Sequence, residues 1–193
     1  MISMLSTGLT GLTLCLLTAC AAPQGSDRAK SAEPVQDRLE QLNAATDRWE
    51  RAGDLDSAQE AAEAVRNLVT GPDVTGYGDL DGNGRTGGAS TIGLLPGEHG
   101  QPGLVRSPAP DCVERDVLGG SWADPSARWA EVRTRVAAWT ATDNTFPTLP
   151  SHPQRVVGWA SLALAAPDLE RAQEYAGHAQ LHVRITEEAL QGC

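Results

Sequence analysis

Residues 71–120 limit what this chain can fold into, because thirteen of its twenty glycines and five of its twelve prolines lie in this one stretch. Glycine loses the most backbone entropy on folding and proline lacks a backbone N–H donor, so a stretch rich in both does not sustain a long helix or strand. The stretch also lacks the apolar periodicity that the residues on either side of it show. We therefore predict helical segments separated by a long Gly/Pro-rich loop insertion at 71–120.

The flanking segments have the apolar spacing of helices. Leu39, Leu42, Thr46 and Trp49 follow one another at helical intervals with charged residues between them. Further along, Asp124 is placed as an N-cap before a proline at the first helical position. Helices are expected at 34–50, 56–70, 125–141, 154–166 and 168–190. No segment reads as a strand, so the predicted fold class is all-α, a four- to five-helix bundle that carries the loop insertion.

The N-terminal residues predict export. An apolar run centred on residues 9–19 precedes the first charged residue, Asp27, and its length suits the hydrophobic region of a signal peptide. The run ends in Leu-Thr-Ala-Cys at 17–20, which resembles the bacterial lipobox. The resemblance implies a lipoprotein signal peptide at 1–19 and lipidation of Cys20; the alternative is a retained anchor or a signal without lipid.

Under the lipoprotein interpretation, the mature chain belongs in the cell envelope, anchored to the membrane by lipid. Residues 20–33 are then a flexible tether, and residues 34–193 are a helical domain with the insertion. If the first two of the four cysteines are lost or acylated, Cys112 and Cys193 remain. Two thiols in an oxidising compartment predict one disulfide, which would close a loop of about 80 residues. The alternative is two unpaired thiols.

Charge and missing motifs restrict the function. The formal net charge is −10, and Lys30 is the only lysine among 15 basic residues, so nucleic acid and anionic membrane surfaces are poor partners. No nucleophile elbow or phosphate-cradling loop is present, and we predict that the chain is not an enzyme. A binding or structural module with an unknown protein or envelope partner is the remaining class.

One motif in the insertion indicates a metal. Counting from Asp79, the sequence Asp-Leu-Asp-Gly-Asn-Gly resembles the first half of an EF-hand loop, with the glycine at position 6 that permits its sharp turn. The resemblance implies side-chain ligands from Asp79, Asp81 and Asn83, a carbonyl ligand from Arg85, and calcium as the cofactor. The alternative is a glycine turn with surface acids. Residues 58–95 also resemble uncharacterised exported bacterial helical proteins, which implies no known activity.

The second half of the loop departs from the EF-hand pattern. Position 12 is Ser90, which cannot supply the two charged oxygens of the usual glutamate. Either a carboxylate arrives from outside the loop, with Asp73 and Glu98 nearest in sequence, or water completes the shell. In the second case we expect an affinity near the millimolar range of extracellular modules.

A second pattern offers an alternative metal site. Glu174, His178 and His182 lie four residues apart on one predicted helix face, as transition-metal and haem sites in helical bundles require. No second pair of ligands accompanies them, since His99 and His152 lie in predicted loops. The alternative function is therefore a bundle that binds a transition metal or haem through this stripe, and the simpler interpretation is ordinary buried or surface histidines.

Overall fold

The computed structural model describes residues 26–140 and 149–193, with side chains described from residue 34 onward in these ranges. The predicted signal peptide, Cys20 and the first part of the predicted tether lie outside the described residues.

Helices make up the regular structure of this part of the chain, and it contains no strand. The elements are α1 (Ser26–Glu50), α2 (Leu55–Thr70), α3 (Asp111–Val113), the π-helical segment η1 (Glu114–Leu118), α4 (Pro125–Ala138), α5 (His152–Leu164) and α6 (Leu169–Gly192). The predicted all-α class is confirmed for the described residues.

The largest differences from the predicted boundaries lie at the start of α1 and near residue 111. Helix α1 begins at Ser26, inside the segment predicted as a tether, and contains Pro34 rather than starting there. Residues 26–33 hold no glycine or proline, so nothing in them stops the helix from extending toward the N-terminus. At the other end of the insertion, residues 111–118 are helical, whereas residues 71–110 have neither helix nor strand.

Side-chain caps explain where four helices begin. At each start, a residue with a short polar side chain accepts a hydrogen bond from the backbone N–H three residues later, which satisfies a donor that the first helical turn leaves free. These pairs are Asp54 with Ser57, Asp124 with Ala127, Ser151 with Gln154, and Asp168 with Arg171. The predicted cap at Asp124 is confirmed, while α5 begins two residues before its predicted start because Ser151 provides the cap.

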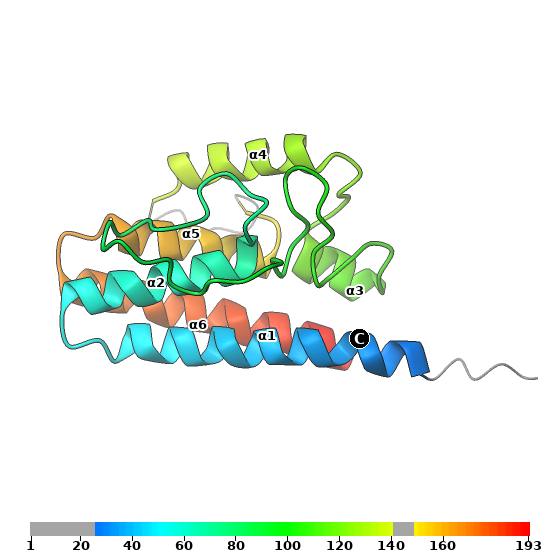
Figure 1. The fold of residues 1–193 in the computed structure, drawn as a ribbon, viewed down its shortest axis with the longest axis horizontal. Helices are drawn as coiled ribbons and strands as arrows, with labels where there is room; N and C mark the ends of the chain where they lie inside the picture. Colours follow the sequence, from blue (N-terminus) through cyan, green and yellow to red (C-terminus); the bar gives the residue numbers. More distant parts are fainter. Residues whose placement is uncertain (1–25, 141–148) are drawn as a thin grey trace, which may run out of the picture.

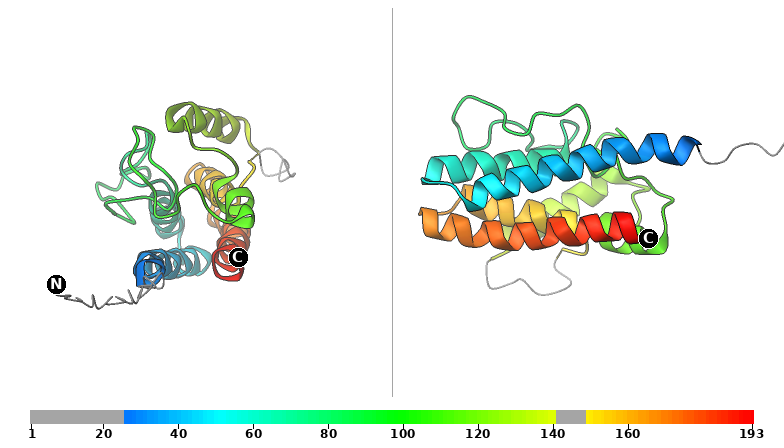
Figure 2. Two further views of the ribbon diagram at one scale, coloured as in Figure 1. Left: turned by 90° about the vertical axis from the view of Figure 1, so that its right-hand side faces the viewer. Right: turned by 90° about the horizontal axis from the view of Figure 1, so that it is seen from below.

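Helices α1, α2, α5 and α6 pack side by side as a bundle (Figure 1). The main contacts run in the order α1, α2, α5, α6 and back to α1, and α2 also touches α6 across the bundle. The end-on view in Figure 2 shows α4 outside this group, above α5, and the segment that follows α2 lying over α2. The segment that follows α2 is therefore supported on one side by a helix of the bundle.

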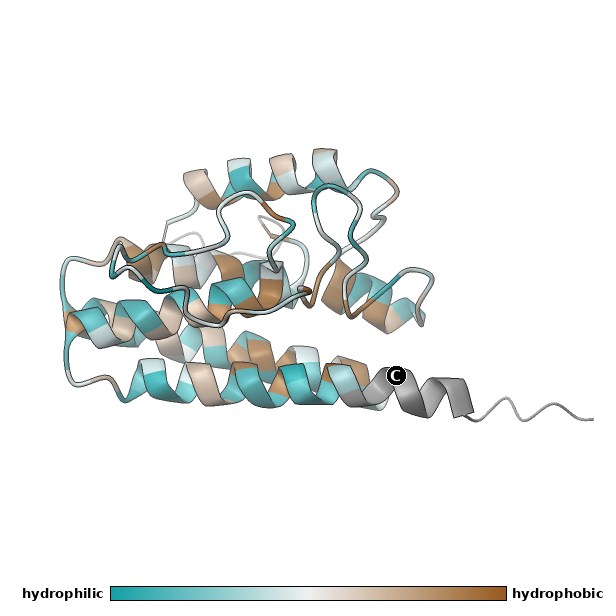
Figure 3. Ribbon diagram, in the orientation of Figure 1, coloured by the Kyte–Doolittle hydropathy of each residue, from teal (hydrophilic) through white to brown (hydrophobic). Residues whose placement is uncertain are grey.

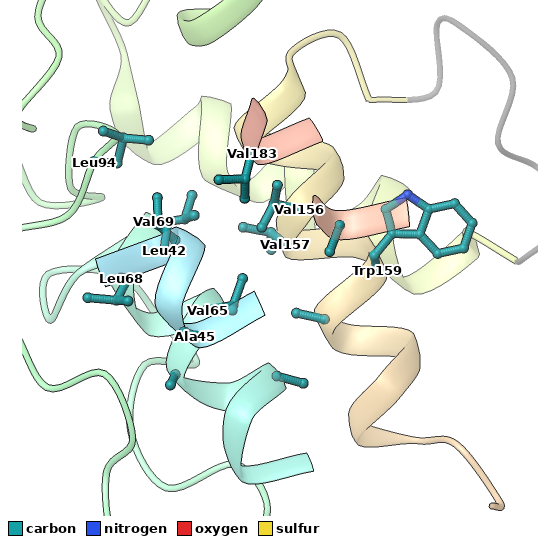
Figure 4. Close-up of a cluster of buried hydrophobic side chains, with 14 of the residues drawn as sticks. Leu42, Ala45, Val65, Leu68, Val69, Leu94, Val156, Val157, Trp159 and Val183 are labelled. Carbon is teal, nitrogen blue, oxygen red and sulfur yellow. The ribbon is translucent and has the colours of Figure 1, made fainter. Parts of the chain in front are cut away.

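The buried face of each helix meets a shared core (Figure 4). The predicted stripe of α1 is buried, with Trp49 fully inaccessible. Nine of the thirteen residues of α5 are buried, so this helix lies at the centre of the core. Figure 3 shows the same contrast, since α1 carries more hydrophilic positions than α5. The five tryptophans are all buried, so they fill the core.

Candidate metal centre

A buried carboxylate on α2 marks the site. Glu63 lies between two alanines in the middle of α2, and it is fully inaccessible to solvent although its side chain is a carboxylate. Carboxylate oxygens of Glu63, Asp79 and Asp81 all lie within 4.8 Å of one another. Helix α2 and the loop that follows it therefore bring three acidic side chains together.

Glu63 also fixes the loop to α2 through hydrogen bonds. Its Oε2 accepts from the backbone N–H groups of Leu80 and of Asp81, the latter at 3.1 Å. Its Oε1 accepts from the N–H of Gly87 at 2.5 Å. A buried carboxylate costs several kcal/mol unless it is hydrogen-bonded or paired, and these three donors satisfy it. The loop is thus held both within its acidic turn and just after it.

Local hydrogen bonds define the acidic turn at 79–85. Asp79 Oδ2 accepts from the N–H of Gly84 at 2.8 Å, and Asp81 Oδ1 accepts from the N–H of Asn83 at 2.9 Å. Asn83 Oδ1 accepts from the N–H of Arg85 at 2.8 Å. Gly84 has a φ of 84°, a left-handed conformation that glycine adopts without strain. Alternate side chains of the turn therefore point inward along a tight bend.

The four predicted ligands do not occupy equivalent places. Asp79 and Asp81 belong to the acidic cluster. Asn83 lies next to it, with its amide nitrogen donating to Asp81 Oδ2 at 2.7 Å. The guanidinium of Arg85, whose carbonyl is the predicted ligand, turns back to α2 and pairs with Glu60 Oε1 at 2.9 Å. The arrangement supplies oxygen atoms, the donors that hard cations such as calcium and magnesium prefer.

Glu63 is the carboxylate that reaches the acidic turn from outside the loop. The two candidates nearest in sequence, Asp73 and Glu98, bond to other groups. Asp73 Oδ2 accepts from the backbone N–H groups of His99 and Gln101, each at 3.0 Å. Glu98 makes two hydrogen bonds with Arg133, at 2.7 and 2.8 Å, and this guanidinium lowers the pKa of Glu98 to about 2.

Sequence reasoning missed Glu63 because it precedes the loop and lies within a regular helix. Its one signal was a single acid within the Ala-rich run Ala61-Ala62-Glu63-Ala64. On an otherwise apolar helix face, such an acid needs a partner from another segment.

The cluster concentrates negative charge. Three carboxylates within this distance repel one another, and a bound cation removes that repulsion while it holds the loop to α2. Arg85 does not take this role, because its guanidinium pairs with Glu60. The residues present therefore fit a divalent cation of the oxygen-binding class.

The alternative histidine stripe does not converge on one point. Glu174 pairs with Arg171 on the same helix. His178 stacks on Trp159, with ring centroids 4.2 Å apart and 10° between the planes. His182 turns toward α5, so the three predicted ligands face three different neighbours, and they form no metal-binding group within the described residues.

His182 meets His152 instead. Their Nδ1 atoms are 3.0 Å apart, although the two residues are 30 positions apart in the sequence. His152 is the first residue of α5 and not a loop residue as predicted. This contact depends on how α5 packs against α6, and no local pattern indicates it.

The predicted disulfide is present. Cys112 in α3 is bonded to Cys193 at the end of α6, and their Cα atoms lie 6.3 Å apart. The bond joins the end of the insertion to the last residue of the sequence given.

No helix in the described ranges is both long enough and apolar enough to cross a membrane. Comparison with protein-family models, with curated proteins and with solved structures finds no match to this chain.

Proposed function

We propose that this chain is an exported, lipid-anchored helical module in which calcium binds the loop at 79–85 and stabilises the insertion at 71–120. Its role in this proposal is to bind or support a partner in the cell envelope rather than to catalyse a reaction. The observation that carries the proposal is the convergence of Glu63, Asp79 and Asp81 within 4.8 Å. The lipobox-like residues before Cys20 support export and lipid attachment.

Calcium suits this ligand set better than a transition metal does. The cluster offers carboxylate oxygens, with the Asn83 amide oxygen and the Arg85 carbonyl nearby in sequence, and it contains no nitrogen or sulfur ligand. Magnesium demands a near-ideal octahedron, whereas calcium accepts six to eight oxygens in flexible geometry. In the proposed site, Glu63 replaces the missing acid at position 12, so the ion links α2 to the loop.

Binding should then raise the stability of the fold. An ion that binds only the native state stabilises it by RT ln(1 + [L]/Kd). For a dissociation constant of about 1 mM, as in extracellular calcium modules, 10 mM calcium contributes about 1.4 kcal/mol. We expect the melting temperature to rise by about 3–6 °C for a chain of this size.

The combined variant Asp79→Asn and Asp81→Asn tests the site. We expect the oxidised wild-type protein to melt at a higher temperature in calcium than in EGTA, and the variant to melt at the same temperature in both. Asp37→Asn combined with Glu40→Gln is the matched control, since it removes two negative charges from exposed positions of α1. The control should keep the full calcium shift.

Magnesium at the same concentrations distinguishes a calcium site from general charge screening. A wild-type melting temperature that does not change up to 10 mM calcium would contradict the proposal. So would an equal shift in magnesium, or a full calcium shift in the Asp79/Asp81 variant.

The lipid anchor has its own test. We expect the protein recovered from membranes of a bacterial host to begin at Cys20 with the mass of an attached diacylglycerol. The variant Cys20→Ser should keep residues 1–19 and carry no lipid, because the thiol that accepts the lipid is absent. Mass spectrometry of the N-terminal peptide measures both, and an unmodified Cys20 at the start of the mature protein would exclude lipidation.

A further inference from the structure

The contact between His152 and His182 is a head-on approach of two ring nitrogens. The Nδ1 atoms are 3.0 Å apart and the ring centroids 5.1 Å apart. The centroid separation exceeds the nitrogen separation by nearly two ring radii, so each nitrogen points almost directly at the other. Two ligands of one metal ion would instead point at an angle toward a shared position about 2.0 Å from each. The geometry is that of an N–H···N hydrogen bond between neutral imidazoles.

The pair has one preferred arrangement of protons. His182 is only 4% exposed, and its Nε2 is buried with no hydrogen-bond partner among the described residues. A neutral imidazole carries one N–H and one bare nitrogen. If His182 Nδ1 donates to His152 Nδ1, the buried Nε2 carries no hydrogen, and no buried donor is left unpaired. This is the tautomer that costs least.

Each way of adding a proton to this pair is unfavourable. A proton on His152 Nδ1 faces the N–H of His182 directly. Moving the hydrogen of His182 to Nε2 relieves that clash, but it leaves a buried N–H without an acceptor. A proton added at His182 Nε2 leaves the same buried donor and a positive charge on the ring as well. The hydrogen bond therefore depends on both rings being neutral.

The charged groups around the pair mostly oppose protonation. Burial is the main cause that lowers the pKa of His182, to about 3, and the charges of His152, Arg155 and His178 lower it further. Burial and Arg155 also lower the pKa of His152, against the opposing effect of Asp116 in η1. Asp116 is itself paired with Arg115, at 2.7 Å.

We propose that the His152–His182 pair is an acid-sensitive latch, which fastens the first turn of α5 to α6 while both rings are neutral and releases it when the pair takes up protons. The sign follows from linkage, because the folded pKa values lie below the ordinary value of 6.5. The contribution of the latch is complete above about pH 6.5 and is lost progressively as the pH falls toward 3. This device is independent of the proposed calcium site, which lies on α2 and the loop.

Amide hydrogen exchange of residues 154–157 tests the latch, since Pro153 has no amide hydrogen. Dividing the measured exchange rate by the intrinsic rate gives the equilibrium constant for opening of this turn. In the wild type we expect this constant to rise as the pH falls from 7.5 to 4.5. One proton taken up on opening corresponds to a rise of up to about tenfold per pH unit below 6.5. His182→Gln should flatten this dependence, because the amide can bond to His152 without titrating.

The control is His99→Gln, which makes the same substitution at a loop histidine whose side chain is 71% exposed. This variant should keep the full pH dependence. All samples contain EGTA, so that a failure of the calcium site cannot be mistaken for a failure of the latch. Exchange that does not vary with pH in the wild type, or a full dependence in His182→Gln, would overturn the proposal.

Nitrogen NMR of the wild-type histidine rings gives a second measurement if the His182 variant does not fold. At pH 7 we expect one Nδ1 of the pair to carry a hydrogen and the other to be bare. Two rings that both titrate near pH 6.5 would show that no such latch exists.

Discussion

Replacing both Cys112 and Cys193 by serine is expected to lower the free energy of unfolding of the oxidised protein by about 4 kcal/mol. The bond joins residues 81 positions apart, so it removes many extended conformations from the unfolded chain. It also ties α3 to Cys193, the residue that follows α6, so it joins two segments that are distant in the sequence. The loss should therefore appear as a large fall in the urea midpoint with the native fold retained.

The reduced wild-type protein provides the matched comparison. Adding a thiol reductant to the wild type should reproduce the midpoint of the serine variant, and the variant itself should not respond to the reductant. These measurements use urea unfolding followed by circular dichroism, in EGTA. A wild-type midpoint that is the same with and without reductant would show that the two cysteines do not stabilise the fold by pairing.

Substitution of Glu63 by alanine is expected to have the next largest effect, a loss of about 3 kcal/mol in EGTA. The carboxylate accepts from the backbone N–H groups of Leu80, Asp81 and Gly87, and all three lose this acceptor. A buried donor left unpaired costs about 1–3 kcal/mol, and access of water to the loop reduces the sum. The calcium shift should disappear in the same variant, since Glu63 is one of the proposed ligands.

Glu60→Ala is the control for this effect. Glu60 lies on the same helix three residues earlier, and its carboxylate pairs with the guanidinium of Arg85, whose side chain is 71% exposed. Removing such an exposed ion pair should cost less than about 1 kcal/mol. Urea unfolding of the wild type, Glu60→Ala and Glu63→Ala measures the two losses of stability. An equal loss in both variants would show that Glu63 has no special role in holding the loop.

The Glu63 variants also separate two roles of one side chain. Glu63→Gln keeps the size of the side chain and one oxygen acceptor but removes the negative charge. If the carboxylate serves only to accept hydrogen bonds, this variant should lose part of the stability in EGTA and keep the calcium shift. If it is also a ligand, as we propose, the calcium shift should fall as well.

Local sequence patterns were sufficient for most of the helices. A cap such as Asp124 acts on backbone groups three residues away, and the stripe from Leu39 to Trp49 repeats within a single helix. The hydrogen bonds of the turn at 79–85 are local in the same way, because they join residues two and five positions apart. Residues 26–33 carry no strong signal for or against a helix, so the start of α1 at Ser26 was not predicted.

The sequence by itself therefore determined the helical class, the acidic turn and the two cysteines available for a bond. Only the tertiary structure decided that Glu63 completes the acidic cluster and that His152 meets His182. These contacts join residues 16 or more positions apart, and they form because apolar faces of different helices and the loop pack together. Burial then favours these polar contacts, because a buried charge or N–H group without a hydrogen-bond partner destabilises the fold.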